Sequence, residues 1–422
     1  MQKGIIVPET LESLLVLRAL GEKAAAKAAR GYLSGSELED VTQAMLALSD
    51  RFNGIDAQPL EGYMNGRWQR AAYFLYFLPA NFAKAHSVLA ELAPTFEAKP
   101  SLSVLDVGSG PGSLSLGLLD FVARKTAVRS LEITALDSSR DALKDWRFLV
   151  DGYRDALAAE GLDVRLTART ATVDLASGVA ADGPWDIVLF GDSLNELFRG
   201  ARDPIADRAR LVASYAARLS ENGAVAAIEP ALKDITRALQ AVRDALVAKH
   251  SLFIYAPCLR QEGCPMLAER HDRDWCHTAT LWTRPKIARR IDQITGRNKF
   301  TVKFSYVVAR RTAGYPVPTL TGATALGGAV SYRDAVSYRA AVSYRAVGDL
   351  LSEKGKVHAL LCGAPGLETF TLLGRDVCPA TESFQGLHRG DILAVSGCEE
   401  KKDGARIMPE SRVEIVRPFT RE

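Results

Sequence analysis

A glycine-rich turn between an apolar run and a helical run constrains the fold more than any other feature of this chain. The sequence VLDVGSGPGS at residues 104–113 passes from apolar residues into Gly108, Gly110 and Gly112. Glycines permit positive φ and let the backbone approach a ligand closely. A helix that begins directly after them presents free amide hydrogens to a bound group. The turn therefore predicts a strand–turn–helix unit with a ligand-binding loop.

Short apolar runs alternate with amphipathic stretches between residues 98 and 250, which predicts βαβ units on a parallel sheet. The runs lie at residues 102–107, 131–136, 164–168, 187–190 and 224–228. Residues 1–97 instead carry apolar side chains at helical spacing, and we expect the aromatic side chains of residues 73–82 to be core. We predict an α/β protein with a Rossmann-like domain at 98–250 and an N-terminal helical region at 1–97.

Three further segments complete the expected domain organisation. Residues 251–318 form a Cys-rich metal-binding and basic segment. Residues 319–352 include a six-residue unit, AVSYRD or AVSYRA, repeated three times, and we interpret them as a low-complexity linker. Residues 353–422 alternate apolar and polar side chains, with a tight turn expected at residues 389–391. This tail predicts a small C-terminal OB-like β-barrel.

Acidic residues around the glycine turn favour S-adenosylmethionine over NAD as the ligand. Asp137 ends the next apolar run, where a carboxylate can accept both hydroxyls of a ribose. Asp106 precedes the glycines, where it can face the cationic amino-acid end of that cofactor. The glycine spacing is G-x-G-x-G rather than the G-x-G-x-x-G usual for a pyrophosphate. The alternative is a glycine turn that binds nothing. The predicted cofactor residues are Asp106, Gly108, Gly110, Gly112, Asp137 and Asp192.

The run WDIVLFGDSLNEL at residues 185–197 predicts a strand whose carboxyl end reaches the same crevice. Asp192, Asn195 and Glu196 at that end are the candidate catalytic residues, and Glu229 after the next strand is a further candidate for the lining. The run lacks the Asn/Asp-Pro-Pro-Tyr/Phe motif of amino-group methylation and the Pro-Cys of pyrimidine C5 methylation. The residues therefore leave the chemistry, and any target nucleotide, open.

All six cysteines follow residue 250, and three of them lie close together as C-x5-C-x11-C at Cys258, Cys264 and Cys276. Cys362 is the fourth candidate. In a reducing compartment such clustering favours metal ligation over disulfides. Four thiolates can hold zinc or an iron–sulfur cluster. Two alternatives stay open: the thiols are buried as small apolar groups, or Cys258 in Pro-Cys is a methylation nucleophile.

Positive charge is concentrated in one stretch of a nearly neutral chain. The whole chain has 53 Lys and Arg against 50 Asp and Glu, a net charge of +3, so net charge alone implies no partner. Residues 284–311 carry nine basic side chains and a single acidic one. Basic residues beside aromatic ones are typical of a polyanion-binding surface, although a solvated charged face is the plainer alternative. The predicted RNA-binding residues are Arg289, Arg290, Arg310 and Arg311.

Several motifs together resemble the methyltransferase-like assembly factors of the small ribosomal subunit, a family of mitochondria with bacterial relatives. They are AYFLYFLPANFA, LDVGSGPGS, DSLNEL, the IEP turn, PC-x5-CP, WCH and KFSYVV, within residues 67–310. LDVGSGPGS by itself resembles motif I of class I methyltransferases. The resemblance implies a Rossmann-like domain, binding to small-subunit rRNA, and a [4Fe–4S] cluster on Cys258, Cys264, Cys276 and Cys362. The resemblance does not imply catalytic turnover. The AVSYR repeat departs from the family pattern.

We therefore expect an S-adenosylmethionine-binding, iron–sulfur protein that acts on or binds small-subunit rRNA. The alternatives are a non-catalytic RNA-binding assembly factor that uses the methyltransferase fold as a scaffold, and a small-molecule methyltransferase. No apolar run is long enough for a membrane helix, and Glu9, Glu12 and Glu22 fit a transit peptide poorly. We expect a monomer in a bacterial-type cytoplasm, or a mitochondrial protein if a presequence is missing from this sequence.

Overall fold

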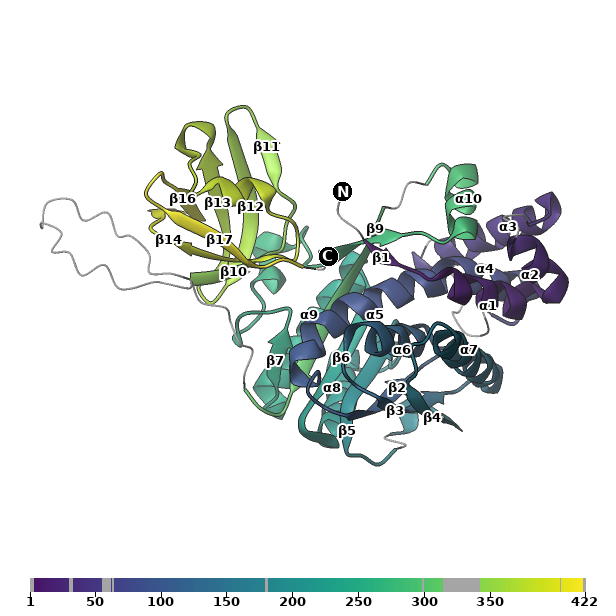
Figure 1. Ribbon diagram of the computed structural model, residues 1–422. Coiled ribbons are helices and arrows are strands. Elements are labelled where there is room, and N and C mark those ends of the chain that lie inside the picture. Colours follow the sequence, from purple (N-terminus) through teal and green to yellow (C-terminus); the bar gives the residue numbers. More distant parts are fainter. Residues whose placement is uncertain are drawn as a thin grey trace, which may run out of the picture.

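The computed structural model describes residues 4–29, 33–54, 62, 64–178, 181–297, 300–313, 342–402 and 404–419. Figure 1 shows a central sheet covered by helices and a separate, smaller sheet formed by the C-terminal part of the chain. None of the described helices is long and apolar enough to span a bilayer.

In the described part of the chain, nine strands form the central sheet, in the order β1-β8-β9-β6-β5-β2-β3-β4, with β7 paired to β9 beside this path. Neighbours from β4 to β6 are parallel, whereas β9 runs antiparallel to β6, β7 and β8. The strands are β1 (Ile5–Ile6), β2 (Ser101–Val107), β3 (Ser130–Asp137), β4 (Arg165–Thr172), β5 (Trp185–Gly191), β6 (Leu219–Pro230), β7 (Phe253–Ala256), β8 (Thr278–Thr283) and β9 (Thr301–Arg310). The order of the parallel strands reverses at β2, so the carboxyl ends of β2 and β5 flank a crevice where ligands of such sheets bind.

Helices cover both faces of the central sheet. Adjacent strand residues alternate between the two cores: Val104 packs with α6, α7 and the N-terminal helices, whereas Leu105 packs with α8 and α9. This alternation follows from the two-residue repeat of a strand. The helices are α1 (Glu9–Leu20), α2 (Glu22–Ala29), α3 (Gly35–Phe52), α4 (Arg67–Ala72), α5 (Leu78–Leu92), α6 (Ser113–Lys125), α7 (Arg140–Ala159), α8 (Pro204–Ala216), α9 (Lys233–His250) and α10 (Lys286–Thr295).

The N-terminal region is helical, as its apolar spacing predicts, apart from the short strand β1. One turn of π-helix, η1 (Tyr73–Phe77), joins α4 to α5. Phe74, Tyr76 and Phe82 are buried in the core, as expected of this aromatic run, but Tyr73 is only half-buried. Single turns of π-helix occur frequently at functional sites.

The Rossmann-like sheet continues beyond residue 250, where the sequence analysis ended that domain. β7, β8 and β9 all come from the expected Cys-rich segment, yet they belong to the central sheet. β9 is buried on both faces, because Phe304 and Val308 pack into one core and Val307 and Ala309 into the other. The Cys-rich loops are therefore connections between strands of this sheet.

The C-terminal sheet begins inside the segment that we predicted to be a linker. Among the described residues it has eight strands in the order β15-β16-β13-β12-β10-β14-β17, with β11 paired to β12. The third AVSYRA unit forms β10, because its backbone pairs with both β12 and β14; the first two units lie outside the described residues. An OB-fold has five strands, so the OB-like barrel stays a prediction. The strands are β10 (Val342–Ala346), β11 (Leu351–Glu353), β12 (Lys356–Gly363), β13 (Gly366–Leu373), β14 (Ile392–Ser396), β15 (Glu399–Lys401), β16 (Gly404–Ile407) and β17 (Arg412–Arg417).

Candidate functional site

The three glycines of the loop between β2 and α6 have different structural roles. Their φ angles are 70° at Gly108, 52° at Gly110 and 99° at Gly112, a region that favours glycine. A Cβ on Gly108 would lie 2.6 Å from the Cβ of Ser193, and one on Gly112 would lie 2.7 Å from Cδ1 of Trp146. A Cβ on Gly110 would meet no atom within 4 Å. Two of the glycines permit close packing, and Gly110 borders open space that a ligand can enter.

The two predicted cofactor carboxylates flank this loop. Asp106 is 1% exposed, and its Oδ2 accepts a hydrogen bond of 2.6 Å from Ser115, while its buried Oδ1 has no partner. Burial raises the pKa of Asp106 to about 7. Asp137 accepts hydrogen bonds of 2.8 Å from the backbone N–H groups of Gly110 and Ser139, and burial raises its pKa as well. An unpaired carboxylate oxygen beside an open loop suits a ligand that donates hydrogen bonds or carries positive charge.

The predicted catalytic residues form a connected group at the ends of β5 and β6. Asp192, with φ 52°, receives hydrogen bonds of 3.1 Å from Nζ of Lys84 to both carboxylate oxygens. Asn195 donates to Glu229 through its backbone N–H, at 3.1 Å, and through its side-chain amide. Glu229 is 1% exposed, and burial and the charge of Asp192 raise its pKa to about 8. Glu196 is exposed beside them.

Two residues of the N-terminal helices, Lys84 and Tyr73, contribute to the crevice although the sequence analysis did not select them. Lys84 lies on α5 and is 7% exposed. Tyr73 belongs to η1, and burial and the charge of Asp192 raise the pKa of its hydroxyl to about 12. The sequence did contain a signal for Lys84, because it is a lysine within an otherwise apolar and aromatic helical stretch. A lysine is seldom buried without a partner, so this pattern predicts an acidic partner nearby.

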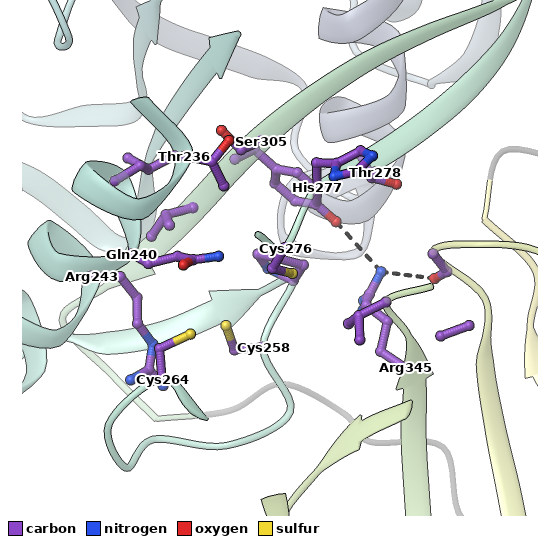
Figure 2. Close-up of a pocket in the computed structure, with 17 residues that line it drawn as sticks. Thr236, Gln240, Arg243, Cys258, Cys264, Cys276, His277, Thr278, Ser305 and Arg345 are labelled. Carbon is purple, nitrogen blue, oxygen red and sulfur yellow. Dashed lines mark hydrogen bonds between the residues drawn. The ribbon is translucent and has the colours of Figure 1, made fainter. Parts of the chain in front are cut away.

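The four predicted metal-ligating cysteines converge, and none of them forms a disulfide. Cys258 follows β7, Cys264 precedes a short 3₁₀ helix, Cys276 precedes β8, and Cys362 lies on β12 of the C-terminal sheet. The first three line one cavity (Figure 2). Burial and, after it, the proximity of Cys258 raise the pKa of Cys264 and of Cys362 to about 12. This mutual electrostatic effect means that all four thiols share one environment.

Positive charge lies beside the four thiols. Within the described residues, no group of three or more His, Cys, Asp and Glu side chains could hold one ion. Burial raises the pKa of Cys276 well above the ordinary value, and the other three thiols add to that effect. Arginines offset part of this repulsion, since Arg243 interacts with Cys258 and Cys264. Four half-buried thiols this close together would be stabilised as thiolates by a cationic centre.

The C-terminal sheet closes one side of this cavity. Arg345 on β10 lines the cavity and forms an ion pair of 2.9 Å with Glu91 on α5, with only 5% and 4% of the two side chains exposed. Arg389, in the turn before β14, donates to the backbone carbonyl of His277, at 3.4 Å. Cys362 is paired with Arg345 across β12 and β10. The contact between the two sheets therefore also positions the fourth thiol.

The predicted RNA-binding arginines do not form one surface. Arg289 and Arg290 on α10 are exposed. Arg310 is 7% exposed, donates to the backbone and side chain of Asn222, and stacks over Tyr255, so its guanidinium is not available to a phosphate. Arg311 is exposed, but it follows the end of β9 that is remote from α10. The strand separates it from α10 by about 30 Å at 3.3 Å per residue. The burial of Arg310 argues against a contact with RNA, and its RNA-binding role stays a prediction.

Gly110→Ala should abolish binding of S-adenosylmethionine and should destabilise the protein less than Gly112→Ala does. An alanine at positive φ costs about 1 kcal/mol, but the added Cβ meets no protein atom and occupies the open space beside the loop. Gly112→Ala is the matched comparison, because its Cβ presses on Trp146 and should mainly lower stability. Calorimetric titration with S-adenosylmethionine and thermal unfolding of both variants measure the two effects. Parental affinity in Gly110→Ala would mean that the cofactor binds elsewhere.

Glu229→Gln should change the pH dependence of stability. Burial keeps the Glu229 carboxyl protonated up to about pH 8 in the folded protein, whereas its ordinary pKa is 4.5. The folded state then binds more protons than the unfolded state in this window, so the parent protein loses stability as the pH rises through it. The variant should lose less free energy of unfolding between about pH 5 and pH 8, by roughly 1 kcal/mol or more. Urea unfolding at both pH values measures this; equal losses would show an ionised Glu229.

Three solved methyltransferase structures are distantly similar to this chain. An S-adenosylmethionine-dependent methyltransferase from Clostridium acetobutylicum has 10% identity and a TM-score of 0.27, covering 54% of this chain and 91% of its own. The plantazolicin methyltransferase, solved in complex with SAH, has 12% identity and a TM-score of 0.31, covering 72% and 98%. A methyltransferase from Streptomyces caelestis has 11% identity and a TM-score of 0.28, covering 55% and 90%. Likenesses this distant say nothing about the activity of this chain.

Comparison with protein families is more informative. No curated protein matches the chain. A family model described as mitochondrial small ribosomal subunit Rsm22 matches residues 67–370. That match covers well over half of the chain, from α4 through the glycine-rich loop to β13. The chain therefore belongs to the Rsm22 family.

Proposed function

We propose that this protein binds S-adenosylmethionine in the crevice at β2 and β5, holds an iron–sulfur cluster on four cysteines, and acts on or binds small-subunit rRNA during ribosome assembly. One observation carries the proposal: the family match includes both the glycine-rich loop and all four cysteines, from Cys258 to Cys362. The family description names the mitochondrial small ribosomal subunit. In this chain we infer the same partner, in a bacterial-type cytoplasm or, with a presequence, in mitochondria.

The crevice has the chemistry that S-adenosylmethionine requires. Asp137 lies at the end of β3, where a carboxylate can accept the ribose hydroxyls. The buried, unpaired Oδ1 of Asp106 can accept from the cationic amino-acid end of the ligand. Binding of this cation would favour ionisation of Asp106, whose pKa of about 7 lets it release a proton near neutrality. Lys84 neutralises Asp192 and so prevents two adjacent uncompensated carboxylates.

The donor set of the cavity suits an iron–sulfur cluster, and zinc is the alternative. Four thiolates can hold either group. The cluster is the group that the resemblance to the family implies. Cys258, Cys264, Cys276 and Cys362 would hold it, and the cluster would supply structural cross-linking and one-electron redox chemistry. Because Cys362 belongs to the other sheet, its ligation would join the two sheets.

The surface around α10 is the proposed contact with RNA. Arg289 and Arg290 are exposed there. Phe300, at the entry to β9, is 60% exposed, and the guanidinium carbon of Arg284 lies 5.2 Å from its ring centroid. Exposed arginines bind phosphates, and an exposed aromatic ring can stack on an unpaired base.

Protein purified anaerobically should be brown, because thiolate-to-iron charge transfer absorbs visible light and a zinc site is colourless. Replacing Cys258, Cys264, Cys276 or Cys362 with serine should remove the colour and lower the iron content. Loss of Cys362 should also loosen the C-terminal sheet while the central sheet stays folded. Visible absorbance, iron analysis and limited proteolysis measure these effects.

The matched control for these variants is Cys378→Ser, since Cys378 does not line the cavity and its half-buried thiol donates to the carbonyl of Pro409. It should keep its colour and its iron. Colourless protein loaded with zinc would refute the cluster. Full iron content in Cys362→Ser would refute the fourth ligand and the link between the two sheets.

Replacing Arg289 and Arg290 together with glutamine should weaken binding of single-stranded small-subunit rRNA fragments and flatten its salt dependence. Each phosphate contact releases counterions and contributes roughly −0.7 to the slope of log affinity against log salt, so the slope should fall by about 1.4. Lys144→Gln with Arg210→Gln removes equal charge from exposed positions on α7 and α8 and should leave the slope unchanged. Fluorescence anisotropy over a salt series measures both. Equal slopes in the parent and the α10 variant would mean that these arginines form only a solvated face.

A non-catalytic scaffold is the second candidate function, and the hydrogen bonding at the strand ends favours it. Asp192 is engaged by Lys84, and Asn195 and Glu229 bond each other, so none of these three is presented free to a substrate. Incubation with S-adenosylmethionine labelled in its methyl group and immature small subunits separates the two candidates. Label transferred to rRNA would establish an enzyme, and binding of both partners without transfer would establish the scaffold.

A further inference from the structure

Helix α9 presents a row of polar side chains to the cavity that contains the thiols. Thr236, Gln240 and Arg243 stand at positions i, i+4 and i+7, so they share one face of the helix. They are 0%, 8% and 1% exposed. The hydroxyl of Thr236, both amide atoms of Gln240 and the Nε of Arg243 are buried without a hydrogen-bond partner.

The row lies opposite the cysteines. All three side chains line the cavity together with Cys258, Cys264 and Cys276, and Figure 2 shows the amide of Gln240 directed toward Cys276 above Cys258. Arg243 also holds the loop between the first two cysteines, because its guanidinium donates to the backbone carbonyls of Arg260 and Glu262. The helix therefore holds the cysteine loop in place. It also presents polar groups that have no hydrogen-bond partner to the cavity beside that loop.

Several buried polar groups without hydrogen-bond partners, side by side, indicate that a bound group accepts hydrogen bonds from them. Burying a hydrogen-bond donor without a partner is unfavourable, and native proteins rarely leave one so. An iron–sulfur cluster on the four thiolates would present sulfide and thiolate sulfurs, which accept hydrogen bonds from amides and hydroxyls. Such bonds stabilise the more negative, reduced form of a cluster more than the oxidised form and therefore raise its reduction potential.

We propose that Gln240, assisted by Thr236, donates hydrogen bonds to the sulfur atoms of the cluster and raises its reduction potential. Both are positioning residues, since neither is a ligand of iron. The inference rests on the proposed function in one respect only, namely that the four cysteines hold an iron–sulfur cluster. It assigns a role to a helix face that the motifs of the sequence did not indicate.

The test uses full-length protein purified anaerobically with its cluster. Gln240→Met keeps the length of the side chain but removes the amide, and Leu239→Met is the matched control, because Leu239 lines the same cavity and has no polar atom to lose. Redox titration followed by visible absorbance and electron paramagnetic resonance measures the midpoint potential. The potential should shift to more negative values in Gln240→Met and stay at the parental value in Leu239→Met, with iron content unchanged in both.

Thr236 supplies an independent pair of variants in case Gln240→Met does not fold. Thr236→Val removes the hydroxyl at nearly constant volume and should shift the potential in the same direction by less, whereas Thr236→Ser retains the hydroxyl and should keep the parental value. Iron-loaded variants with parental potentials would overturn the inference and leave the cluster standing. Parent protein without iron would overturn the proposed cluster itself, so the two failures are distinguishable.

Discussion

The buried ion pair between Glu91 on α5 and Arg345 on β10 joins the C-terminal sheet to the helices of the central sheet. Both side chains are almost fully removed from water, and Arg345 also donates to the backbone carbonyl of Gly390, at 3.0 Å. Removing either partner would leave an uncompensated buried charge, which destabilises proteins by about 3–5 kcal/mol. The pair helps to hold the C-terminal sheet against the central one, together with the hydrogen bonds of Arg389 to His277 and of Arg417 to Ala90 and the stacking of Tyr306 on Phe419.

The crevice and the thiol cavity are adjacent parts of one structure. Glu229 ends β6 in the crevice, and α9 follows it and carries Gln240 to the cavity. Between them Ser305 of β9 lines the cavity and donates to the backbone carbonyl of Glu229, at 3.5 Å. The elements β6, β9 and α9, which connect the two sites, pack on one another.

Local patterns predicted most of the parallel strands. The apolar runs at 102–107 and 131–136 correspond to β2 and β3, and the glycine spacing located the loop with positive φ. The short strand β8 was not predicted, because its apolar alternation is brief. β10 was missed for another reason: its sequence is one of three similar units, and nothing local distinguishes the one that pairs with β12 and β14.

The amino-acid sequence by itself determined the strand–turn–helix loop, the acidic residues at the strand ends and the identity of the four thiols, because each depends on residue type and short spacing. Only the tertiary structure decided which distant groups meet them. Lys84 reaches Asp192 from a helix that precedes the sheet, Gln240 faces the cysteines, and Arg310 is buried although it belongs to a basic run. Contacts of this kind depend on how elements far apart in the chain pack. The free energy that stabilises this packing comes from the whole core, so no single segment of the sequence predicts it.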